Sequence, residues 1–367
     1  MNKLDARNRV AALAVYPGQP RSVHLTSLAL PSLGASDVLI RVRRVGVCGT
    51  DREIISAHFG RAPDGTDELV IGHELLGVVD AVGPDVTHFA PGGLVSATVR
   101  RPDGCPACFA GQPDFCLWRN YTERGILGAH GFMAERIVER EDHLISIPCE
   151  LEPVGVLLEP LSVVEKAVRQ ADLIQRRIVG WRPATALVLG AGPIGLLGTL
   201  LLRARDVTVY TLARSRPPTP ASRIVEACGA HYVSIQENGI AETAAALPNI
   251  DLILEATGHA EPAFQAMEVL GNNGVLVLLS LTGGDARAAV PVDNLIRQQV
   301  LGNKVVVGSV NAAPEDFSNG VEHLGEFESR WPGLTETMIT TRLNGFDETA
   351  DIADAATEGI KTVLEIP

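Results

Sequence analysis

The feature that most constrains the fold of this chain is an alternation of apolar runs and helix-period stretches after residue 185. Short apolar runs bounded by turn residues indicate buried strands, and longer stretches with helical spacing lie between them. The expected strands are Ala186–Leu189, Val207–Leu212, Leu252–Glu255, Val275–Leu279 and Lys304–Val310. The expected helices are Ile194–Arg205, Pro220–Cys228 and Pro262–Leu270. Because strands that alternate with helices form a parallel sheet, we expect an α/β fold in which helices cover the sheet.

A glycine-rich turn joins the first of these strands to the first helix. The residues Gly190-Ala-Gly192-Pro193-Ile194-Gly195 match the pattern G-x-G-x-x-G in a strand–turn–helix context. Gly190 would make the tight turn, Gly192 would let the backbone approach a pyrophosphate, and Gly195 would let helix and strand pack closely. The helix N-terminus at Pro193 and Ile194 would offer free N–H groups to the phosphates. The turn predicts a doubly wound Rossmann domain that binds a dinucleotide, and a turn without a ligand is the alternative.

The end of the second expected strand bears on which nicotinamide cofactor fits. An acidic residue there would accept hydrogen bonds from the ribose 2′-hydroxyl of NAD. The chain instead has Arg214, Ser215 and Arg216, and a guanidinium pairs well with a 2′-phosphate. NADP is therefore the expected cofactor and NAD is possible. The alternative is that both arginines are solvated loop charges.

Composition and charge narrow the class of protein. The chain has 367 residues, which is enough for two domains. Lys and Arg number 31 and Asp and Glu number 44, so the formal net charge is −13, which argues against a nucleic-acid partner or an anionic membrane surface. The longest apolar stretch, residues 186–202, is interrupted by glycines and falls short of the ~20 residues that span a bilayer. The chain also begins without the pattern of a secretory signal, so we expect a cytoplasmic protein with a small-molecule partner.

Three separated segments carry side chains that bind metals. They are Cys48, the adjacent pair His73 and Glu74, and Glu159. Zinc accepts thiolate, imidazole and carboxylate ligands, and a catalytic zinc keeps one position open for water or substrate. Each residue alone is more simply explained as a buried side chain, since cysteine is among the most often buried residues. The set predicts a zinc site if the fold brings these segments together.

Two motifs around these residues resemble the signature of zinc-dependent medium-chain dehydrogenases. They are the stretch G-H-E-x-x-G-x-V-x-x-V-G-x-x-V from Gly72 to Val86 and the stretch G-x-C-G-T-D from Gly46 to Asp51. The resemblance covers essentially the whole chain. It implies a GroES-like, β-rich catalytic domain formed by residues 1–183 and 312–367, with a Rossmann domain at residues 184–311 inserted between them. It also implies a homo-oligomer, either a dimer or a tetramer.

Within this superfamily the chain is most similar to the archaeal-type glucose dehydrogenases. The similar segments are Arg100–Asp103, Gly111–Cys116, Gly128–Gly131 and Val307–Asn311. The likeness implies hydride transfer from C1 of an aldose to the nicotinamide, which leaves a lactone, with zinc acting as a Lewis acid on the C1 hydroxyl. The identity of the sugar stays open because Val99 and Leu301 stand where some relatives have Asn and His.

The same likeness implies a role for each candidate residue. Cys48 and His73 would bind the catalytic zinc directly. Glu74 and Glu159 would bind it either directly or through a water molecule. Thr50 would hydrogen-bond the reacting oxygen and pass its proton toward solvent. The residues implied to contact the sugar are Thr50, Glu123 and Asn311, and Asn311 is also expected at the cofactor.

A cysteine cluster implies a second metal site. Many relatives hold a structural zinc with four cysteines, and this chain keeps the spacing C-x₂-C-x₇-C at Cys105, Cys108 and Cys116. Pro102 stands at the place of the first cysteine, so Asp103 would have to supply the fourth ligand that structural zinc requires. The alternative is a degenerate loop with no metal and three free thiols.

Two other functions stay open on the sequence alone. The segment Glu159–Val163 also resembles the polyol dehydrogenases, which oxidise open-chain secondary alcohols with similar zinc chemistry, and threonine dehydrogenases are a more distant option. A non-catalytic nucleotide-binding protein is the alternative from another class. The intact set of metal-binding side chains argues against it.

Overall fold

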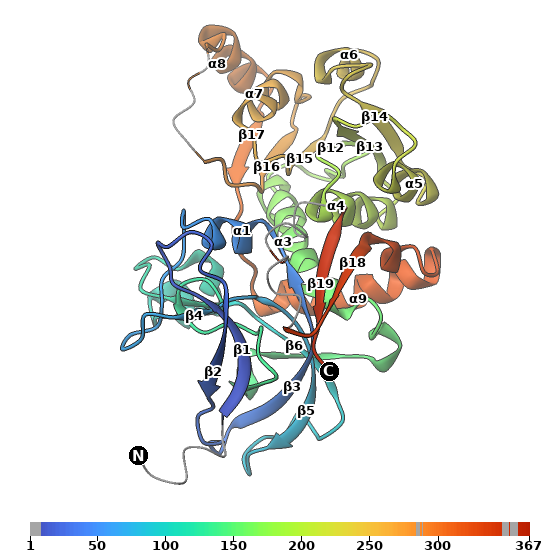
Figure 1. Cartoon of the computed structure of the whole chain (residues 1–367). Helices are drawn as coiled ribbons and strands as arrows, with labels where there is room; N and C mark the ends of the chain where they lie inside the picture. Colours follow the sequence, from blue (N-terminus) through green and yellow to red (C-terminus); the bar gives the residue numbers. More distant parts are fainter. Residues whose placement is uncertain (1–8, 284–286, 288, 347–351, 353–358) are drawn as a thin grey trace. The chain divides into compact units, whose positions relative to one another are not determined.

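The computed structural model describes residues 9–283, 287, 289–346, 352 and 359–367, and the chain divides into two compact units (Figure 1). The β-rich unit consists of residues 1–159, 311–324 and 339–367. The parallel-sheet unit consists of residues 160–310 and 325–338. The β-rich unit therefore draws on both ends of the chain.

The parallel-sheet unit is built on six strands in the order β14-β13-β12-β15-β16-β17. They are β12 (Thr185–Leu189), β13 (Thr208–Ala213), β14 (His231–Ser234), β15 (Leu252–Glu255), β16 (Val275–Leu278) and β17 (Val305–Gly308). All neighbouring strands are parallel, and the chain winds outward from β12 to β14 before it returns to β15 on the other side. This is the doubly wound strand order of dinucleotide-binding folds, so the predicted Rossmann sheet is confirmed.

Helices precede, connect and follow the strands of this sheet. They are α3 (Leu158–Gln175), α4 (Pro193–Ala204), α5 (Pro220–Ala227), α6 (Ile240–Ala245), α7 (Ala260–Val269) and α8 (Val292–Leu301), followed later by α9 (Pro314–Arg330) and the 3-10 turn η6 (Thr335–Met338). Helix α4 packs on β12, β13 and β15 through a run of buried leucines. Among the described residues, no helix has both the length and the apolar character that crossing a bilayer requires.

Between residues 185 and 310 the sequence predicts most of these elements and misses three. Each expected strand and helix of this unit is present within two residues of its expected ends. The sequence does not predict β14, α6 or α8. β14 and α6 are short, and neither carries a hydrophobic period long enough to be recognised.

The β-rich unit is organised around a seven-stranded sheet. Six strands follow the order β11-β6-β5-β3-β19-β18, and β10 also pairs with β3. These strands are β3 (Asp37–Val47), β5 (Glu74–Val82), β6 (Leu94–Ala97), β10 (Arg136–Arg140), β11 (Leu144–Ile147), β18 (Ile339–Asn344) and β19 (Lys361–Glu365). Residues 38–47 lie in β3, and the apolar segment at 69–82 forms two separate strands.

Two smaller sheets and several short helices complete this unit. One sheet joins β1 (Arg9–Val15), β2 (His24–Ala29) and β4 (Leu69–Val70), and the other joins β7 (Arg100–Arg101), β8 (Thr122–Arg124) and β9 (Gly128–Ala129). The helices are α1 (Gly49–Ile55) and α2 (Pro106–Phe109). The 3-10 turns are η2 (Pro113–Phe115), η3 (Glu141–His143), η4 (Cys149–Leu151) and η5 (Gly155–Leu157).

The last strand of the chain lies inside the seven-stranded sheet. β19 pairs antiparallel with β3 and parallel with β18, so Leu364 is paired with Val45 on one side and Leu343 on the other. All three side chains belong to the hydrophobic core of the unit. The C-terminal strand therefore completes a core that the N-terminal strands begin.

The bounds of the two units differ from the expected domain bounds at three places. Asn311 belongs to the β-rich unit, and residues 160–183 and 325–338 belong to the parallel-sheet unit. There Gln175 donates a hydrogen bond to the carbonyl of Asn273, and Arg330 pairs with Asp206 at 3.3 Å. The expected bounds also include residues 1–8 and most of 347–358, which lie outside the described residues, and these bounds stay a prediction.

The variant Leu364→Ala tests the role of the C-terminal strand. Leu364 is 1% exposed, so its truncation leaves a cavity and is expected to lower the free energy of unfolding by about 2–5 kcal/mol. The matched control is Leu25→Ala on β2, where the side chain is 56% exposed and the expected change is within about 0.5 kcal/mol. Urea denaturation measures both, and equal effects of the two variants would contradict the placement of β19 in the core.

Candidate functional site

Cys48 stands where β3 ends and α1 begins. Its Sγ accepts a hydrogen bond from the backbone N–H of Thr50 at 3.2 Å, so the thiol caps the helix. The carboxylate of Asp51 caps in the other direction and accepts from the backbone N–H of Cys48 at 2.9 Å. This reciprocal capping box fixes the thiol at the strand end.

His73 lies against this capped turn. Its Nε2 is 3.1 Å from Sγ of Cys48, and its Nδ1 is 3.6 Å from Oδ1 of Asp51. Asp51 is fully buried, and its Oδ1 also accepts from the backbone N–H of Gly72 at 3.3 Å. A carboxylate behind the outer ring nitrogen of a histidine is the arrangement that orients metal-binding imidazoles. The ring therefore presents Nε2 to the same place as the thiol.

The charges around His73 explain the shift of its pKa. Burial alone would lower the pKa of His73, but the negative charges of Cys48 and Asp51 raise it well above its usual value. The pKa of Asp51 is lowered because the attraction of His73 outweighs its burial. The surroundings of His73 therefore favour positive charge, which is the property that a cation site requires.

Glu74 follows His73 on β5 and completes the group of donors. Donor atoms of Cys48, His73 and Glu74 all lie within 4.8 Å of one another. Both carboxylate oxygens of Glu74 pair with Nζ of Lys361, which also donates to the carbonyl of Val47 at 3.1 Å. Two of the three segments that the sequence singles out, those of Cys48 and of His73 with Glu74, thus meet in one cluster.

Lys361 is a residue that the sequence analysis misses. It opens β19, and both it and Glu74 have side chains that are only 1% exposed. Burial alone would lower the pKa of Lys361, but the charge of Glu74 raises it above its usual value. The signal in the sequence is a lone lysine at the head of the apolar strand Lys361–Glu365. No local motif connects it with a residue 287 positions earlier.

Glu159 lies in the first turn of α3, next to this cluster. Its carboxyl group is buried, and burial raises its pKa to about 7. His73 opposes this shift and Glu74 reinforces it, so Glu159 interacts electrostatically with both. It is not in the group whose donors lie within 4.8 Å of one another. A buried carboxyl with a raised pKa would gain from a neighbouring cation.

The cysteine cluster forms a second group of donors. Cys105 lies 3.5 Å from Cys108 and 3.9 Å from Cys116 between sulfur atoms. Carboxylate oxygens of Asp103 lie 3.5 Å from Sγ of Cys108 and 3.0 Å from Sγ of Cys116. A tetrahedron with zinc–sulfur bonds of ~2.3 Å has sulfur–sulfur edges of roughly 3.8 Å and sulfur–oxygen edges of roughly 3.5 Å. The four side chains therefore have the spacing of a closed structural zinc site.

Asp103 is held in this cluster by its neighbours. The thiol of Cys116 donates to the carboxylate, and the backbone N–H groups of Cys105 and Asn120 add hydrogen bonds of 3.0 Å each. These contacts, the thiol first, lower the pKa of Asp103 to about 2. The residue expected to replace the missing cysteine is thus a charged carboxylate beside the three thiols.

The glycine turn in the parallel-sheet unit has the conformation that its sequence requires. Gly190 has φ +103°, and a Cβ on Gly195 would overlap the carbonyl oxygen of Gly190. Gly192 differs, because a Cβ there would meet no atom of the protein within 4 Å. Neither the fold nor the packing needs a glycine at 192, so the open space in front of it suits a ligand that approaches the backbone. Pro193 opens α4, and Ile194 follows it in the first turn.

The arginines expected at the cofactor lie in the loop after β13. Arg214, Ser215 and Arg216 are all exposed. The hydroxyl of Tyr232 donates to the carbonyl of Ser215 at 2.9 Å and anchors the loop. Arg216 pairs with Glu237 at 3.8 Å. Both guanidinium groups are thus accessible to an anion at the end of this strand.

Two residues expected to contact the sugar lie together in the β-rich unit. Nδ2 of Asn311 donates to Oε1 of Glu123 at 2.9 Å, although the residues are 188 positions apart. Val99 is buried and directly precedes β7, the strand that pairs with the strand of Glu123. Leu301 is exposed at the end of α8 in the other unit. Glu123 and Asn311 therefore act as one polar group.

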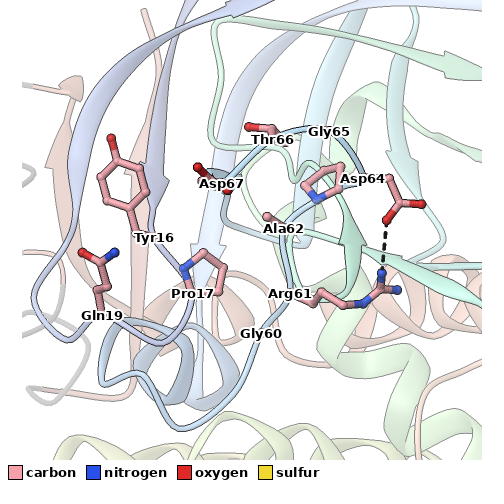
Figure 2. A pocket seen from close by; sticks show the side chains of 11 residues that line it. Tyr16, Pro17, Gln19, Gly60, Arg61, Ala62, Asp64, Gly65, Thr66 and Asp67 are labelled. Atoms are coloured by element: carbon pink, nitrogen blue, oxygen red, sulfur yellow. Dashed lines mark ion pairs between the residues drawn. The ribbon is translucent and has the colours of Figure 1, made fainter.

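An open pocket of about 800 Å³ lies elsewhere in the β-rich unit (Figure 2). It is lined by the loop 60–67 and by residues near Tyr16, and Arg61 pairs with Asp64 on its wall at 3.7 Å. None of the candidate site residues lines it. Its walls offer exposed loop side chains, and they lack the clustered donors found around Cys48.

Comparison with known proteins identifies both parts of the chain. Residues 34–149 match the alcohol dehydrogenase GroES-like domain, and residues 152–366 match the glucose dehydrogenase C-terminus. Glucose 1-dehydrogenase of Methanocella arvoryzae is 43% identical over 97% of this chain and 99% of the relative. Glucose 1-dehydrogenase of Halobacterium salinarum is 41% identical over 94% of this chain and 96% of the relative.

Solved structures show the same architecture. Glucose dehydrogenase of Haloferax mediterranei, solved in complex with NADP, Zn and gluconolactone, is similar with a TM-score of 0.87. It is 34% identical, and the match covers 97% of this chain and 99% of that chain. The expected fold class, a GroES-like domain together with a Rossmann domain, is confirmed.

The glycine turn gives a matched pair of variants. Gly192→Ala is expected to leave the melting temperature unchanged and to raise the Kd for NADPH by about tenfold, which is ~1.4 kcal/mol, because its methyl group fills the open space. Gly195→Ala is expected to lower the melting temperature, since its methyl group overlaps a backbone carbonyl that cannot move aside. Fluorescence titration and thermal denaturation measure the two effects. Wild-type NADPH affinity in Gly192→Ala would contradict a dinucleotide at this turn.

Proposed function

We propose a function for this chain, which belongs to the glucose dehydrogenase family because residues 152–366 match the C-terminal model of that family. It oxidises an aldose such as glucose at C1 and transfers the hydride to a nicotinamide cofactor, which leaves the lactone. The observation that carries this function is the cluster of Cys48, His73 and Glu74 in the β-rich unit. The glucose 1-dehydrogenases that resemble the chain over nearly its full length support it.

Zinc is the metal that this donor set fits. A thiolate, an imidazole and a carboxylate are the ligand types of zinc, and the imidazole is oriented by Asp51 as metal-binding histidines are. Cys48 and His73 would hold the metal, with Glu74 and Glu159 binding directly or through water. When bound, zinc supplies a Lewis acid that lowers the pKa of a hydroxyl group beside it.

The protein's own groups orient the sugar and handle its proton. The hydroxyl of Thr50 accepts the proton of the C1 hydroxyl and passes it toward solvent, while Glu123 and Asn311 hold other hydroxyls of the sugar. A bound nicotinamide cofactor would supply the acceptor for the hydrogen of C1 and its electron pair, so that C1 would become the carbonyl carbon of the lactone. The hydride chemistry belongs to the cofactor, and the protein contributes position and electrostatics.

The cofactor is NADP, with NAD as a second possibility. The open backbone at Gly192 and the N-terminus of α4 suit the pyrophosphate. The exposed Arg214 and Arg216 suit a 2′-phosphate, and no acidic residue ends β13. The Haloferax mediterranei relative was solved with NADP, which agrees with this choice.

Initial rates with aldoses, polyols and threonine test the function. We expect NADPH formation with aldoses, faster than NADH formation. Cys48→Ser and His73→Ala are each expected to reduce turnover by about 100-fold or more, because the metal would be lost or misplaced. Activity with polyols alone would move the chain to the polyol dehydrogenases with the same zinc chemistry.

Cys149→Ser serves as the matched control for the cysteine variant. Cys149 is exposed and lies outside both donor groups, so its variant is expected to keep wild-type turnover. Full activity of Cys48→Ser in a preparation shown by metal analysis to contain no zinc would overturn the zinc mechanism.

We also propose that Asp103, Cys105, Cys108 and Cys116 hold a structural zinc. The spacing of the four donors supports a closed tetrahedral site, and a structural zinc contributes directly to folding. This part of the proposal is independent of the reaction.

Zinc content measured by mass spectrometry tests this second site. We expect about two zinc ions per wild-type chain and about one in Asp103→Ala or Cys116→Ser, since a structural site needs four ligands. The same variants are expected to melt at a lower temperature. One zinc in the wild type and an unchanged count in Asp103→Ala would contradict the structural site.

The oligomeric state and the cytoplasmic location expected from the sequence stay predictions. One feature supports self-association: α8 and β17 expose large apolar side chains in the parallel-sheet unit. These are Val292, Ile296, Val300, Leu301 and Val306. β17 is also an edge strand, with β16 on one side only among the described strands.

A further inference from the structure

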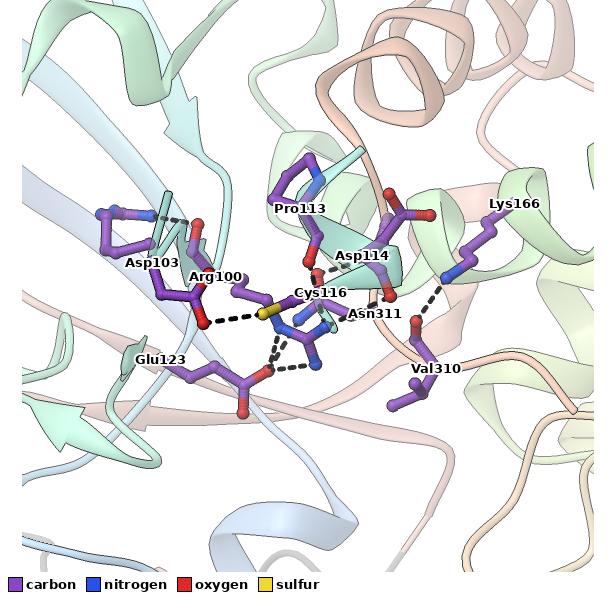
Figure 3. A network of polar contacts seen from close by, with 11 residues as sticks. Arg100, Asp103, Pro113, Asp114, Cys116, Glu123, Lys166, Val310 and Asn311 are labelled. Atoms are coloured by element: carbon purple, nitrogen blue, oxygen red, sulfur yellow. Dashed lines mark hydrogen bonds and ion pairs between the residues drawn. The ribbon is translucent and has the colours of Figure 1, made fainter. Parts of the chain in front are cut away.

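A buried arginine next to the expected sugar-binding residues carries the further inference. Arg100, on β7, is 5% exposed and is paired with Glu123 on β8. Its Nε and Nη2 both donate to Oε1 of Glu123, at 3.0 and 2.9 Å (Figure 3). We propose that Arg100 is a positioning residue that aims Glu123 at a single hydroxyl of the sugar. The inference rests on the proposed function.

Arg100 is itself held on every side. Its Nη1 donates to the backbone carbonyls of Pro113 and Asp114, both at 3.2 Å. Its guanidinium lies over the ring of Tyr121, 3.8 Å from the ring centroid. A planar guanidinium with these contacts has one position and one orientation, which a flexible ammonium group would not have.

A third donor converges on the same oxygen. Nδ2 of Asn311 reaches Oε1 of Glu123, while Oδ1 of Asn311 accepts from the backbone N–H of Ala312 at 2.7 Å. The backbone of Asn311 is left-handed, with φ +60°, a conformation that asparagine tolerates better than most residues. The amide is therefore fixed by its own turn, and it adds to the hold of Arg100 on Oε1.

The other oxygen of Glu123 is left for a ligand. No described residue donates a hydrogen bond to Oε2, and 10% of the side-chain surface of Glu123 stays exposed. Figure 3 shows the three donors on one oxygen, with the second oxygen turned away from them. A carboxylate held in this way offers one accessible acceptor in a fixed direction, and a hydroxyl group is the donor that it suits.

The local backbone connects this acceptor with the metal-binding cluster. Two residues after Glu123, Gly125 packs so closely on Gly72 that a Cβ would overlap its carbonyl oxygen. Gly72 directly precedes His73. A shift of Glu123 along β8 is thus limited by the same backbone that carries the candidate metal ligand. The direction of Oε2 therefore depends on the side-chain contacts of Glu123, and Arg100 makes most of these contacts.

The test compares glucose with its 2-, 3-, 4- and 6-deoxy derivatives in wild type, Arg100→Lys and Arg100→Met. Removal of the hydroxyl that Oε2 accepts is expected to lower kcat/KM of the wild type by about tenfold to a hundredfold, as for a hydrogen bond to a charged group. In Arg100→Lys this penalty is expected to shrink at that hydroxyl alone. KM for glucose should rise while KM for NADP stays unchanged.

Two further variants separate positioning from a general loss of structure. Glu123→Gln should remove the penalty at the same hydroxyl, and adding Arg100→Lys to it should change the penalties no further, because the two residues act as a unit. Arg101→Met is the matched control. Arg101 is the next residue on β7 and pairs with Glu139, so its variant should lose stability and keep every wild-type penalty.

Arg100→Lys keeps a cation opposite Glu123, so the test does not depend on the folding of Arg100→Met. Unchanged penalties in a folded Arg100→Lys, or penalties that shrink equally at all hydroxyls, would overturn the positioning role and leave the proposed function standing. A wild-type protein that oxidises no aldose would overturn the proposed function and this inference together.

Discussion

The ion pair between Glu74 and Lys361 is the contact on which the β-rich unit depends. Both charges are almost completely removed from water, and each is tolerable only because the other lies beside it. The pair joins the start of β5 to the start of β19, and Lys361 also reaches the carbonyl of Val47. Gly46 leaves the room that the carboxylate occupies, since a Cβ there would overlap it. The C-terminal strand β19 is thus locked to β3 and β5 beside the candidate metal ligands.

In the rest of the candidate site, too, one buried polar group contacts several partners. Asp51 caps α1, binds the backbone before His73 and faces the imidazole, so one buried carboxylate orients both Cys48 and His73. Its burial is offset by these partners. Burial raises the pKa of Glu159, although the charges of His73 and Lys361 oppose this shift. A cation held by Cys48 and His73 would oppose it further.

On the proposed function, the two units would recognise their ligands by different means. The parallel-sheet unit would rely on backbone, since the turn at Gly190 and the start of α4 offer space and N–H groups. The β-rich unit would rely on side chains that are fixed by other side chains. Glu123 has little freedom because Arg100 and Asn311 share one of its oxygens. Recognition by backbone is local in sequence, whereas recognition by a polar network requires residues from distant segments.

Local patterns therefore determined the parallel sheet, the glycine turn and which side chains are candidates for binding a metal. The strand–turn–helix at Gly190 lies within a few residues, so its hydrophobic period and its glycines are legible in the sequence. Only the tertiary structure showed that Asp103 completes the cluster of three cysteines, that Lys361 pairs with Glu74, and that Arg100 holds Glu123. The first of these was one of two alternatives on the sequence, and the other two carry no local signal. The physical reason is that a buried charge is specified by its partner, and the partner is chosen by how strands from distant parts of the chain are paired.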